Sequence, residues 1–307
     1  MDLKQLRTFL KVAQARSLSR ASDELRLAQS ALSRQIRLLE ERIGQPLFTR
    51  SARGMELTGA GIELQSRVAG LLEQLEKSLD EVGSFSATPS GRVALGMVPT
   101  VSYLLVARIA RRVVREYPHI SLRIVEGYTG HLIQWLNSGE VDATLLYGSG
   151  EGNHLRLRSL VQEELVLAGA SGDPLIGSAP MKVAELSGLK LVLPSKPHGL
   201  RGVVENAARH AGITLNVIFE ADSFHTLKEL VETSMGYTVL PVSAFSRSAD
   251  AGRYALGSLV APHVSRQIAL ALPANRTDSL ATLTVANVVQ EEMHSAIAEG
   301  RWQASIS

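Results

Sequence analysis

The apolar residues change their spacing near residue 84, and this change limits the possible folds more than any other feature. Up to residue 83 they mostly recur every three or four positions, which predicts helices. From residue 92 onward, short apolar runs alternate with helical segments, which predicts a parallel sheet with crossover helices. Residues 84–91 (SFSATPSG) between them have the composition of a linker. A chain of 307 residues, at roughly 150 residues per domain, also predicts about two domains.

The first 58 residues predict a winged helix-turn-helix. Leu3–Ala15 has an apolar stripe, and a second helix is expected to begin with Ser19 as its N-cap. A third helix, Gln29–Arg42, follows after a break of three residues, which is the helix-turn-helix arrangement. Apolar residues then flank the basic tip Thr49–Gly54, which predicts a small β-wing.

Charge separates the same two parts of the chain. Residues 1–58 hold two lysines and nine arginines against six acidic residues, a net charge of +5, and the whole chain is +2. The remaining residues therefore carry −3. A basic head on a mildly acidic body is expected where only the head meets a polyanion. On charge alone, an arginine-rich surface that merely faces water is an equally good interpretation.

The polar face of the third helix supplies candidates for reading DNA. Opposite its apolar stripe lie Gln29, Ser30, Ser33, Arg34 and Arg37. These side chain types can recognise base edges in the major groove. The candidates for contacts to phosphates or to the minor groove are Arg50 and Arg53 at the wing tip, and Thr8 and Arg20 on the earlier helices. An exposed polar face needs no ligand by itself, but the helix spacing, the wing and the charge together favour DNA.

A long helix is expected from Gly59 to about Val82, with Thr58 as its N-cap. Its apolar residues recur at alternating steps of three and four, with one step missing at Ser78, which predicts a coiled-coil seam of roughly three heptads. The seam consists of Leu64, Val68, Leu71, Leu75 and Val82. The alternative is a helix packed on its own domain, but a dimerisation helix suits a segment between two complete domains better.

The residues indicate no enzyme, no metal site and no cofactor. Cysteine is absent, which excludes thiolate nucleophiles and Cys-based metal sites, and neither a G-x-S-x-G nor an H-E-x-x-H motif occurs. The neighbouring acids Glu163–Glu164 and Glu291–Glu292 diverge on any regular element, so we interpret both pairs as solvated. No apolar run approaches the ~18 residues of a membrane helix, and no signal peptide is recognisable, so a soluble, cytoplasmic protein without a membrane partner is expected.

One family combines these features. The run Phe9–Phe48 (FLKVAQARSLSRASDELRLAQSALSRQIRLLEERIGQPLF), then Thr49–Arg50 and the segment 57–61 (LTGAG), resembles the N-terminal domain of LysR-type transcriptional regulators. Ala28 departs from the family pattern, in which Ser often caps the recognition helix, and this forfeits about 0.5–2 kcal/mol of capping. Ser22 replaces a frequent Ala. The segment 236–241 (GYTVLP) resembles these regulators too, and short runs near residues 145 and 193 resemble the branch with the nitrogen assimilation control protein.

The resemblance implies an α/β protein overall with three parts. These are a winged helix-turn-helix DNA-binding domain at 1–58, a linker helix and hinge at 59–90, and a two-lobed periplasmic-binding-protein-like effector domain at 91–307. Lobe I is expected at about 91–162 and 267–303, and lobe II at about 163–266, with crossover strands near Leu160–Leu165 and Ser265–Ile268. The implied partners are double-stranded promoter DNA, a small-molecule effector, RNA polymerase and further copies of the chain, as a dimer or a dimer of dimers.

An effector is expected in the cleft at the carboxyl ends of the parallel strands. By position the candidates are Thr100, Ser102, Thr129, Ser195, His198, Arg201, Ser223 and Thr226, of which Thr100 and Thr129 match the family best. His198 and Arg201 lie three residues apart at a helix start, so both could face a carboxylate, which predicts an anionic effector. Alternatively, each threonine merely caps its helix.

Two other functions fit the same fold. A solute-binding module with a helical adaptor would explain the body, but the basic head and the lack of a signal peptide disfavour it. A metabolic enzyme would require a titratable pair in the cleft, and His198 is the only histidine that we place there.

Overall fold

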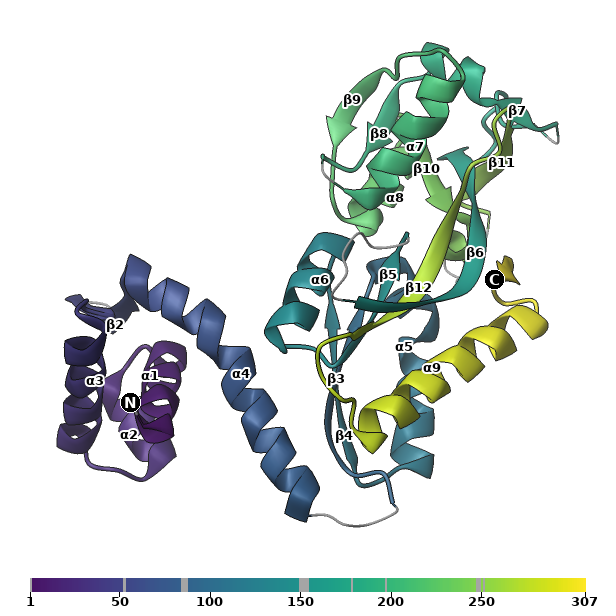
Figure 1. The fold of residues 1–307 in the computed structure, drawn as a ribbon. Coiled ribbons are helices and arrows are strands. Elements are labelled where there is room, and N and C mark those ends of the chain that lie inside the picture. The colour runs from purple at the N-terminus through teal and green to yellow at the C-terminus, as the bar shows by residue number, and fades with distance from the viewer. Residues whose placement is uncertain are drawn as a thin grey trace. The chain divides into compact units, whose positions relative to one another are not determined.

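The structure is a computed structural model that describes residues 2–51, 54–83, 88–148, 155–177, 179–196, 198–246, 250 and 252–307. The chain divides into two compact units, made mainly of residues 1–85 and of residues 86–307 (Figure 1). Over the described residues, no helix has both the length and the apolar character that crossing a bilayer requires.

The first unit begins with three helices that enclose a small apolar core. They are α1 (Leu3–Ala15), α2 (Leu18–Leu25) and α3 (Gln29–Ile43). The N-cap of α2 is Ser17, whose hydroxyl accepts a hydrogen bond from Arg20 N, so the prediction that Ser19 caps this helix is wrong. Ala28 is the N-cap of α3 and makes no side-chain hydrogen bond. Phe9 of α1 and Leu32 of α3 are fully buried against each other's helices in this core.

The wing is a two-stranded antiparallel sheet of β1 (Phe48–Ser51) and β2 (Gly54–Leu57). Gly54 adopts a left-handed conformation with φ of 114°, and a Cβ at this position would lie 2.4 Å from the carbonyl oxygen of Arg16. Met55 N donates to the same carbonyl at 3.0 Å. Glycine is therefore required where the wing attaches to the end of α1.

The long helix α4 (Gly59–Gly83) follows the wing. Thr58 caps it as predicted, because its hydroxyl accepts from Gly61 N at 3.0 Å.

The second unit contains a nine-stranded mixed sheet and a separate two-stranded parallel sheet. The strands are β3 (Gly91–Met97), β4 (Ile120–Glu126), β5 (Ala143–Tyr147), β6 (Leu155–Ala170), β7 (Met181–Lys182), β8 (Leu191–Leu193), β9 (Val217–Glu220), β10 (Thr238–Pro241), β11 (Tyr254–Val260), β12 (Ser265–Pro273) and β13 (Ala304–Ile306). The large sheet runs β4-β3-β5-β12-β6-β11-β7, and β10 and β13 also pair with β6, while β8 and β9 form the small sheet.

Helices surround these strands. They are α5 (Pro99–Glu116), α6 (Thr129–Ser138), α7 (Gly199–His210), α8 (Phe224–Glu232) and α9 (Leu280–Ala298), with short 3-10 helices η1 (Val183–Gly188) and η2 (Val242–Phe245). Helix α5 begins at Pro99. Proline with its fixed φ suits the first helical position, so the helix starts directly after β3.

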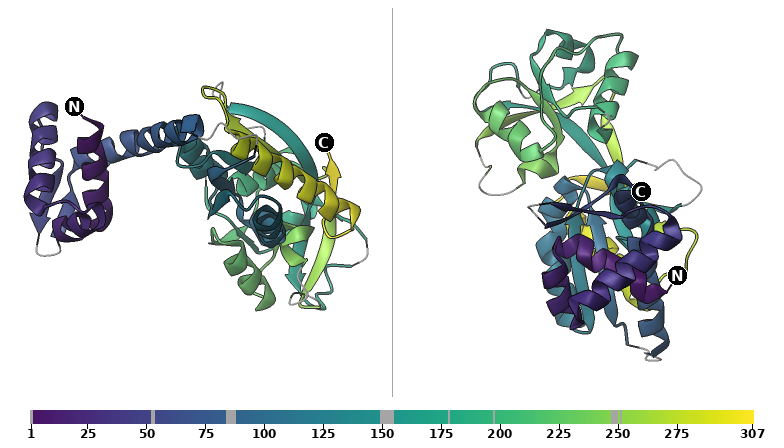
Figure 2. Two further views of the ribbon diagram at one scale, coloured as in Figure 1. Left: turned by 90° about the horizontal axis from the view of Figure 1, so that it is seen from below. Right: turned by 90° about the vertical axis from the view of Figure 1, so that its left-hand side faces the viewer.

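Strand β6 belongs to two lobes of this unit. Its first part pairs with β12 over residues 155–164, and its last part pairs with β10 and β11 over residues 165–170. Each lobe has its own apolar core. Figures 1 and 2 show β6 passing from the lobe with α5, α6 and α9 to the lobe with α7 and α8.

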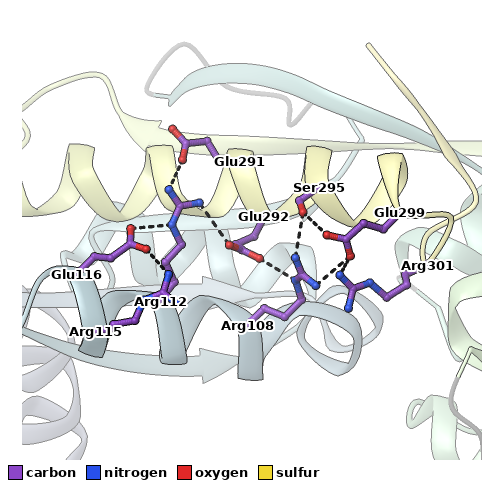
Figure 3. Close-up of polar contacts among 9 residues, drawn as sticks. All are labelled: Arg108, Arg112, Arg115, Glu116, Glu291, Glu292, Ser295, Glu299 and Arg301. Atoms are coloured by element: carbon purple, nitrogen blue, oxygen red, sulfur yellow. Dashed lines mark hydrogen bonds and ion pairs between the residues drawn. The ribbon is translucent and has the colours of Figure 1, made fainter.

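A polar network joins α5 to α9 on one lobe (Figure 3). It consists of Arg108, Arg112, Arg115, Glu116, Glu291, Glu292, Ser295, Glu299 and Arg301. Glu292, only 8% exposed, accepts from Arg108 Nε at 2.7 Å and from an Arg112 guanidinium nitrogen at 3.3 Å. The interpretation of Glu291–Glu292 as a solvated pair is therefore wrong for Glu292, because two arginines of α5 draw its side chain into the helix interface.

Candidate DNA-binding surface and ligand cleft

Helix α3 separates its apolar and polar residues onto opposite sides. Leu32, Ile36 and Leu39 are buried in the core of the first unit. The candidates for base recognition lie on the outer side, where Gln29, Ser30, Arg34 and Arg37 are exposed and Ser33 is half-buried. A groove beside α3 is lined by Ser30, Ser33, Arg34 and Arg37 together with Phe48 and Met55 of the wing. The helix therefore presents a continuous row of hydrogen-bonding side chains to solvent.

The contacts of Thr8 differ from the prediction. Its side chain is 1% exposed, and its hydroxyl donates to Gln35 Oε1 on α3. A buried hydroxyl cannot reach a phosphate, so Thr8 supports the recognition helix from inside instead of clamping DNA. Arg20 is exposed in the first turn of α2 and stays a candidate for a phosphate contact. The side chain of Arg50 and all of Arg53 lie outside the described residues.

The apolar stripe of α4 has two different environments. Leu64 and Val68 are partly buried against the core of the first unit, so this part of the helix packs on its own domain. Leu71 is 63% exposed and Leu75 is 36% exposed. The side chain of Val82 lies outside the described part. Leu71 and Leu75 thus form an exposed apolar surface on α4.

The second unit has a cleft between its two lobes. Lobe I contributes Pro99, Thr100, Tyr128 and Tyr147, and lobe II contributes Pro194, His198, Leu200, Asp222, Phe224, Leu227 and Leu240. Arg266 lies on β12, where the chain passes between the lobes. The free volume of this cleft is about 20 Å³, room for about one water molecule. The Tyr128 hydroxyl donates to the backbone carbonyl of Asp222 and so joins the lobes across the cleft. In this conformation the side chains largely fill the cleft.

A buried ion pair forms the floor of the cleft. Arg266 of β12 donates from Nε to Glu163 Oε1 of β6 at 2.7 Å. Ser243 Oγ and Trp302 Nε1 donate to the other oxygen of Glu163 at 3.0 and 2.9 Å. Burial opposes the positive charge of Arg266, but the charge of Glu163 outweighs it and the pKa of Arg266 is raised. The interpretation of Glu163 as a solvated residue is wrong, because it lies on the buried strand between the lobes.

Arg266 also contacts two other lining residues, Thr100 and Tyr147. It donates to Thr100 Oγ1 at 2.8 Å, and its guanidinium carbon lies 3.8 Å from the centre of the Tyr147 ring. The hydroxyls of Thr100 and Tyr147 share a hydrogen bond of 2.5 Å. Thr129 Oγ1 in turn accepts from Tyr147 N at 3.2 Å. Thr100 and Thr129 are thus engaged with Tyr147, and Val98 is the N-cap of α5, so Thr100 does not cap that helix.

The other predicted effector residues separate into two groups. His198 lines the cleft. Ser195 does not, but its hydroxyl donates at 2.6 Å to Oδ1 of Asp222, which is a lining residue. Ser102 is buried and donates to Glu126 at 2.5 Å. Arg201 lies outside the lining, since its guanidinium contacts Glu205, Glu220 and the carbonyl of Pro194. Ser223 and Thr226 are exposed and do not line the cleft either.

Two lining residues have shifted pKa values. Burial lowers the pKa of His198, Asp222 opposes this shift, and Arg266 adds to it. The pKa of Asp222 is lowered by hydrogen bonds from the hydroxyl and the backbone N–H of Ser195. Near neutral pH, His198 is therefore uncharged and Asp222 is ionised. Among the described residues, no group of three or more His, Asp or Glu side chains could hold a metal ion.

Several lining residues escape the sequence analysis. Tyr128, Asp222 and Arg266 belong to no recognised motif, and Tyr147 stands in a run that resembles the family but was not predicted to line the cleft. Arg266 does interrupt the apolar strand that we predict as a crossover, and Glu163 interrupts the other one. A charged residue inside a buried strand usually has a partner of opposite charge, so this pair could have been inferred.

Comparison with known proteins covers both units. Residues 86–294 match the model of the LysR substrate binding domain. Residues 3–62 match that of bacterial regulatory helix-turn-helix proteins of the lysR family.

Three curated relatives illustrate the similarity. The HTH-type transcriptional regulator BbuR of Bordetella bronchiseptica is 28% identical over 304 residues, covering 98% of this chain and 93% of that protein. The nitrogen assimilation regulatory protein nac of Escherichia coli is 28% identical over 305 residues, 99% of each chain. The probable cat1 operon transcriptional activator of Acinetobacter lwoffii is 32% identical over 254 residues, covering 80% of this chain and 82% of that protein.

Solved structures of similar fold include two nearly full-length matches. A cysteine variant of full-length OxyR from Pseudomonas aeruginosa has a TM-score of 0.73 and 23% identity, covering 96% of this chain and 95% of that one. Full-length CbnR complexed with its target DNA has a TM-score of 0.73 and 19% identity, covering 95% of this chain and all of the other. At these identities the likeness shows the fold alone.

Proposed function

The chain belongs to the LysR family of DNA-binding transcriptional regulators, whose members have an effector-binding domain, and from this premise we propose how its parts divide the work. Residues 1–58 bind promoter DNA, residues 59–90 join two chains, and residues 91–307 bind a small-molecule effector. Within the effector domain we assign lobe I to about 91–162 and 267–303, and lobe II to about 163–266. The solute-binding and enzyme alternatives do not account for the match of residues 3–62 to the helix-turn-helix model.

The exposed polar side of α3 is the observation that carries the proposal for DNA. Gln29, Ser30, Ser33, Arg34 and Arg37 face solvent, and α3 has the place in the fold that a recognition helix takes in the major groove. CbnR, similar in fold, was solved with its target DNA. Arginine can form a bidentate pair of hydrogen bonds with guanine, and glutamine can do so with adenine. Arg34 and Gln29 are therefore the strongest candidates for base recognition. We assign Arg20, Arg50 and Arg53 to the DNA backbone or the minor groove.

We propose that the chain dimerises through the exposed stripe of α4. Leu71 and Leu75 offer apolar surface, Leu64 and Val68 fix the helix on its own head, and Val82 continues the same stripe in sequence. A dimer would place two recognition helices on two half-sites of an interrupted palindrome. We further propose a dimer of dimers through the effector domains, and RNA polymerase as a partner of the promoter-bound protein.

The effector is proposed to bind in the interlobe cleft around Thr100 and His198. A ligand there acts if it prefers one arrangement of the assembly over another, because only a difference in affinity shifts such an equilibrium. Our hypothesis of an anionic effector depended on His198 and Arg201 acting together. The bonds of Arg201 to Glu205 and Glu220 remove this support.

A gel-shift titration against the DNA upstream of the chain's own gene, at two salt concentrations, tests the proposal. We expect saturable binding that survives an excess of non-specific competitor DNA. Binding that disappears with competitor or with modest salt would mean that the basic head is only an electrostatic patch, and would contradict sequence-specific regulation.

A further inference from the structure

We propose that the interlobe cleft selects a small, flat effector that carries no negative charge and has a hydrogen-bond donor, either an uncharged group or a cation. This inference rests on the proposed function, because it names the chemical class of the ligand for the same cleft. It departs from the anionic effector that the sequence suggests. Four observations on the described lining residues support it.

First, the cationic side chain of the lining is already neutralised. Arg266 bonds to Glu163 through Nε at 2.7 Å and through a terminal nitrogen at 2.5 Å, and both side chains are almost fully buried. Its terminal nitrogen also donates to Thr100, and its flat face covers the Tyr147 ring. A ligand carboxylate would have to compete with Glu163 for Arg266. Separating this pair would leave two buried charges, those of Arg266 and Glu163, without a partner.

Second, His198 supplies a neutral donor and not a positive charge. Its Nδ1 accepts a hydrogen bond from Leu200 N at 3.1 Å and thereby caps α7. An imidazole nitrogen that accepts carries no proton, so in the neutral ring the proton is on Nε2. Protonation of Nδ1 would remove the cap and place a second cation near Arg266. The group that His198 offers to a ligand is therefore one uncharged N–H.

Third, Asp222 is a carboxylate that no cation in the described lining neutralises. Its Oδ1 accepts from the backbone N–H of Ser195 at 2.9 Å and from the Ser195 hydroxyl at 2.6 Å, both neutral donors. These hydrogen bonds hold the carboxylate in place but do not neutralise its negative charge. With Arg266 cancelled by Glu163, the lining has a net negative character that repels an anion and attracts a donor or a cation.

Fourth, the remaining walls are apolar and partly aromatic. Pro99, Leu200, Leu227 and Leu240 line the cleft along with the rings of Tyr128, Tyr147 and Phe224. The Tyr128 ring lies 4.6 Å from the His198 ring, edge to face. Surfaces of this kind favour a planar ring over a flexible chain. Since the cleft has room for about one water molecule, the ligand must displace the Tyr128 hydroxyl from the Asp222 carbonyl to enter.

Three probes with one ring and different charges test the inference: benzoate, benzamide and benzamidine. We would measure the dissociation constant of each for the full-length protein by ligand-observed NMR titration. Benzamide and benzamidine are expected to bind at least about fivefold more tightly than benzoate, which is the effect of one well-solvated charge pair about 4 Å apart. Asp222→Asn should weaken the binding of benzamidine by a similar factor and bring its dissociation constant closer to that of benzoate.

The control variant is Glu229→Gln, which removes an exposed carboxylate of the same lobe on α8, outside the lining. It should leave all three dissociation constants unchanged, and the melting temperatures of both variants show whether each has folded. Benzoate binding as tightly as benzamide, or no binding by any probe, would overturn the inference. Operator binding in the gel shift would be intact in either case, so such a result would not contradict the proposed DNA-binding function, which fails only if that binding is lost.

Discussion

Arg266 and Glu163 lie directly opposite each other on the paired strands β12 and β6, and their side chains form an ion pair of 2.7 Å beneath the cleft. Because β6 belongs to both lobes, this pair fixes the point at which the chain passes from one lobe to the other. Both side chains are almost fully buried, so neither can be hydrated if its partner is removed.

We expect Glu163→Gln to destabilise the effector domain by about 3–5 kcal/mol, because it leaves the charge of Arg266 buried without a counter-charge. Urea unfolding measures the effect. Glu164→Gln is the matched control, since Glu164 is exposed and pairs with the exposed His263, a contact worth at most about 1 kcal/mol. Equal losses in the two variants would contradict a structural role for the buried pair.

Arg34→Ala should cost roughly 1–3 kcal/mol of DNA-binding free energy, concentrated at one base position of the operator, because we propose that Arg34 bonds a base edge. Arg53→Ala should weaken binding to all operator sequences by the same factor and reduce the dependence of affinity on salt. Gel shifts on a panel of single-base operator variants distinguish the two. Identical behaviour of both mutants on every operator would show that our division into reading and anchoring residues is wrong.

Thr8→Val should reduce the free energy of unfolding by about 1–2 kcal/mol, because it leaves the Gln35 amide without its partner. Since Thr8 is buried, the salt dependence of DNA binding should not change. Thermal unfolding and gel shifts at several salt concentrations measure both quantities. A flatter salt dependence with unchanged stability would instead indicate the phosphate contact that the sequence suggested.

Leu71→Asp and Leu75→Asp together should raise the dimer dissociation constant by about tenfold or more, because they place charges in a proposed apolar interface. Sedimentation equilibrium measures the effect. Ile62→Asp is the control: Ile62 is 59% exposed on the same helix, but about half a turn away from the stripe. If Ile62→Asp dissociates the dimer and the leucine variant does not, the seam has been assigned to the wrong side.

His198 should make the folded state less stable as the pH falls below about 6.5. Its pKa in the folded protein lies below the value of about 6.5 in the unfolded chain, so the unfolded chain binds more protons in this range. Asp222, Arg266 and the Tyr128 ring are the groups that face it. His198→Asn retains a capping side chain and should flatten the dependence of unfolding free energy on pH below about 6.5. His263, whose raised pKa acts in the opposite direction, is present in both proteins and cancels. Parallel curves for the two proteins would rule out this contribution.

The sequence predicts the first unit well because its structure depends on local patterns. Helix periodicity and capping residues fixed α1, α3 and α4 almost to the residue, and only the start of α2 was misplaced. In the effector domain, the expected crossover strand near Leu160–Leu165 covers only part of β6, which extends over Leu155–Ala170. Its first ten residues hold four charged side chains, of which only Glu163 is buried, and no local pattern reveals that the segment pairs with distant strands.

The cleft was harder to predict for the same reason. Position along the chain identified Thr100 and His198, but not that Arg201 would turn toward Glu205 and Glu220. Whether a side chain near a helix start faces a cleft depends on partners elsewhere in the sequence. Arg266 and Glu163 lie about a hundred residues apart, and only the pairing of β12 with β6 brings them together.

The contacts between α5 and α9 have a mechanical consequence. The first turn of α5 lines the cleft at Pro99 and Thr100, while Arg108 and Arg112, two and three turns further on, are held by Glu292 of α9. An 18-residue helix is a stiff rod about 27 Å long. A ligand that pushes on its first turn must therefore move α9 with it or break the contacts to Glu292. Because of these contacts, a change at the cleft end of α5 involves α9, a helix that contributes no residue to the described lining of the cleft.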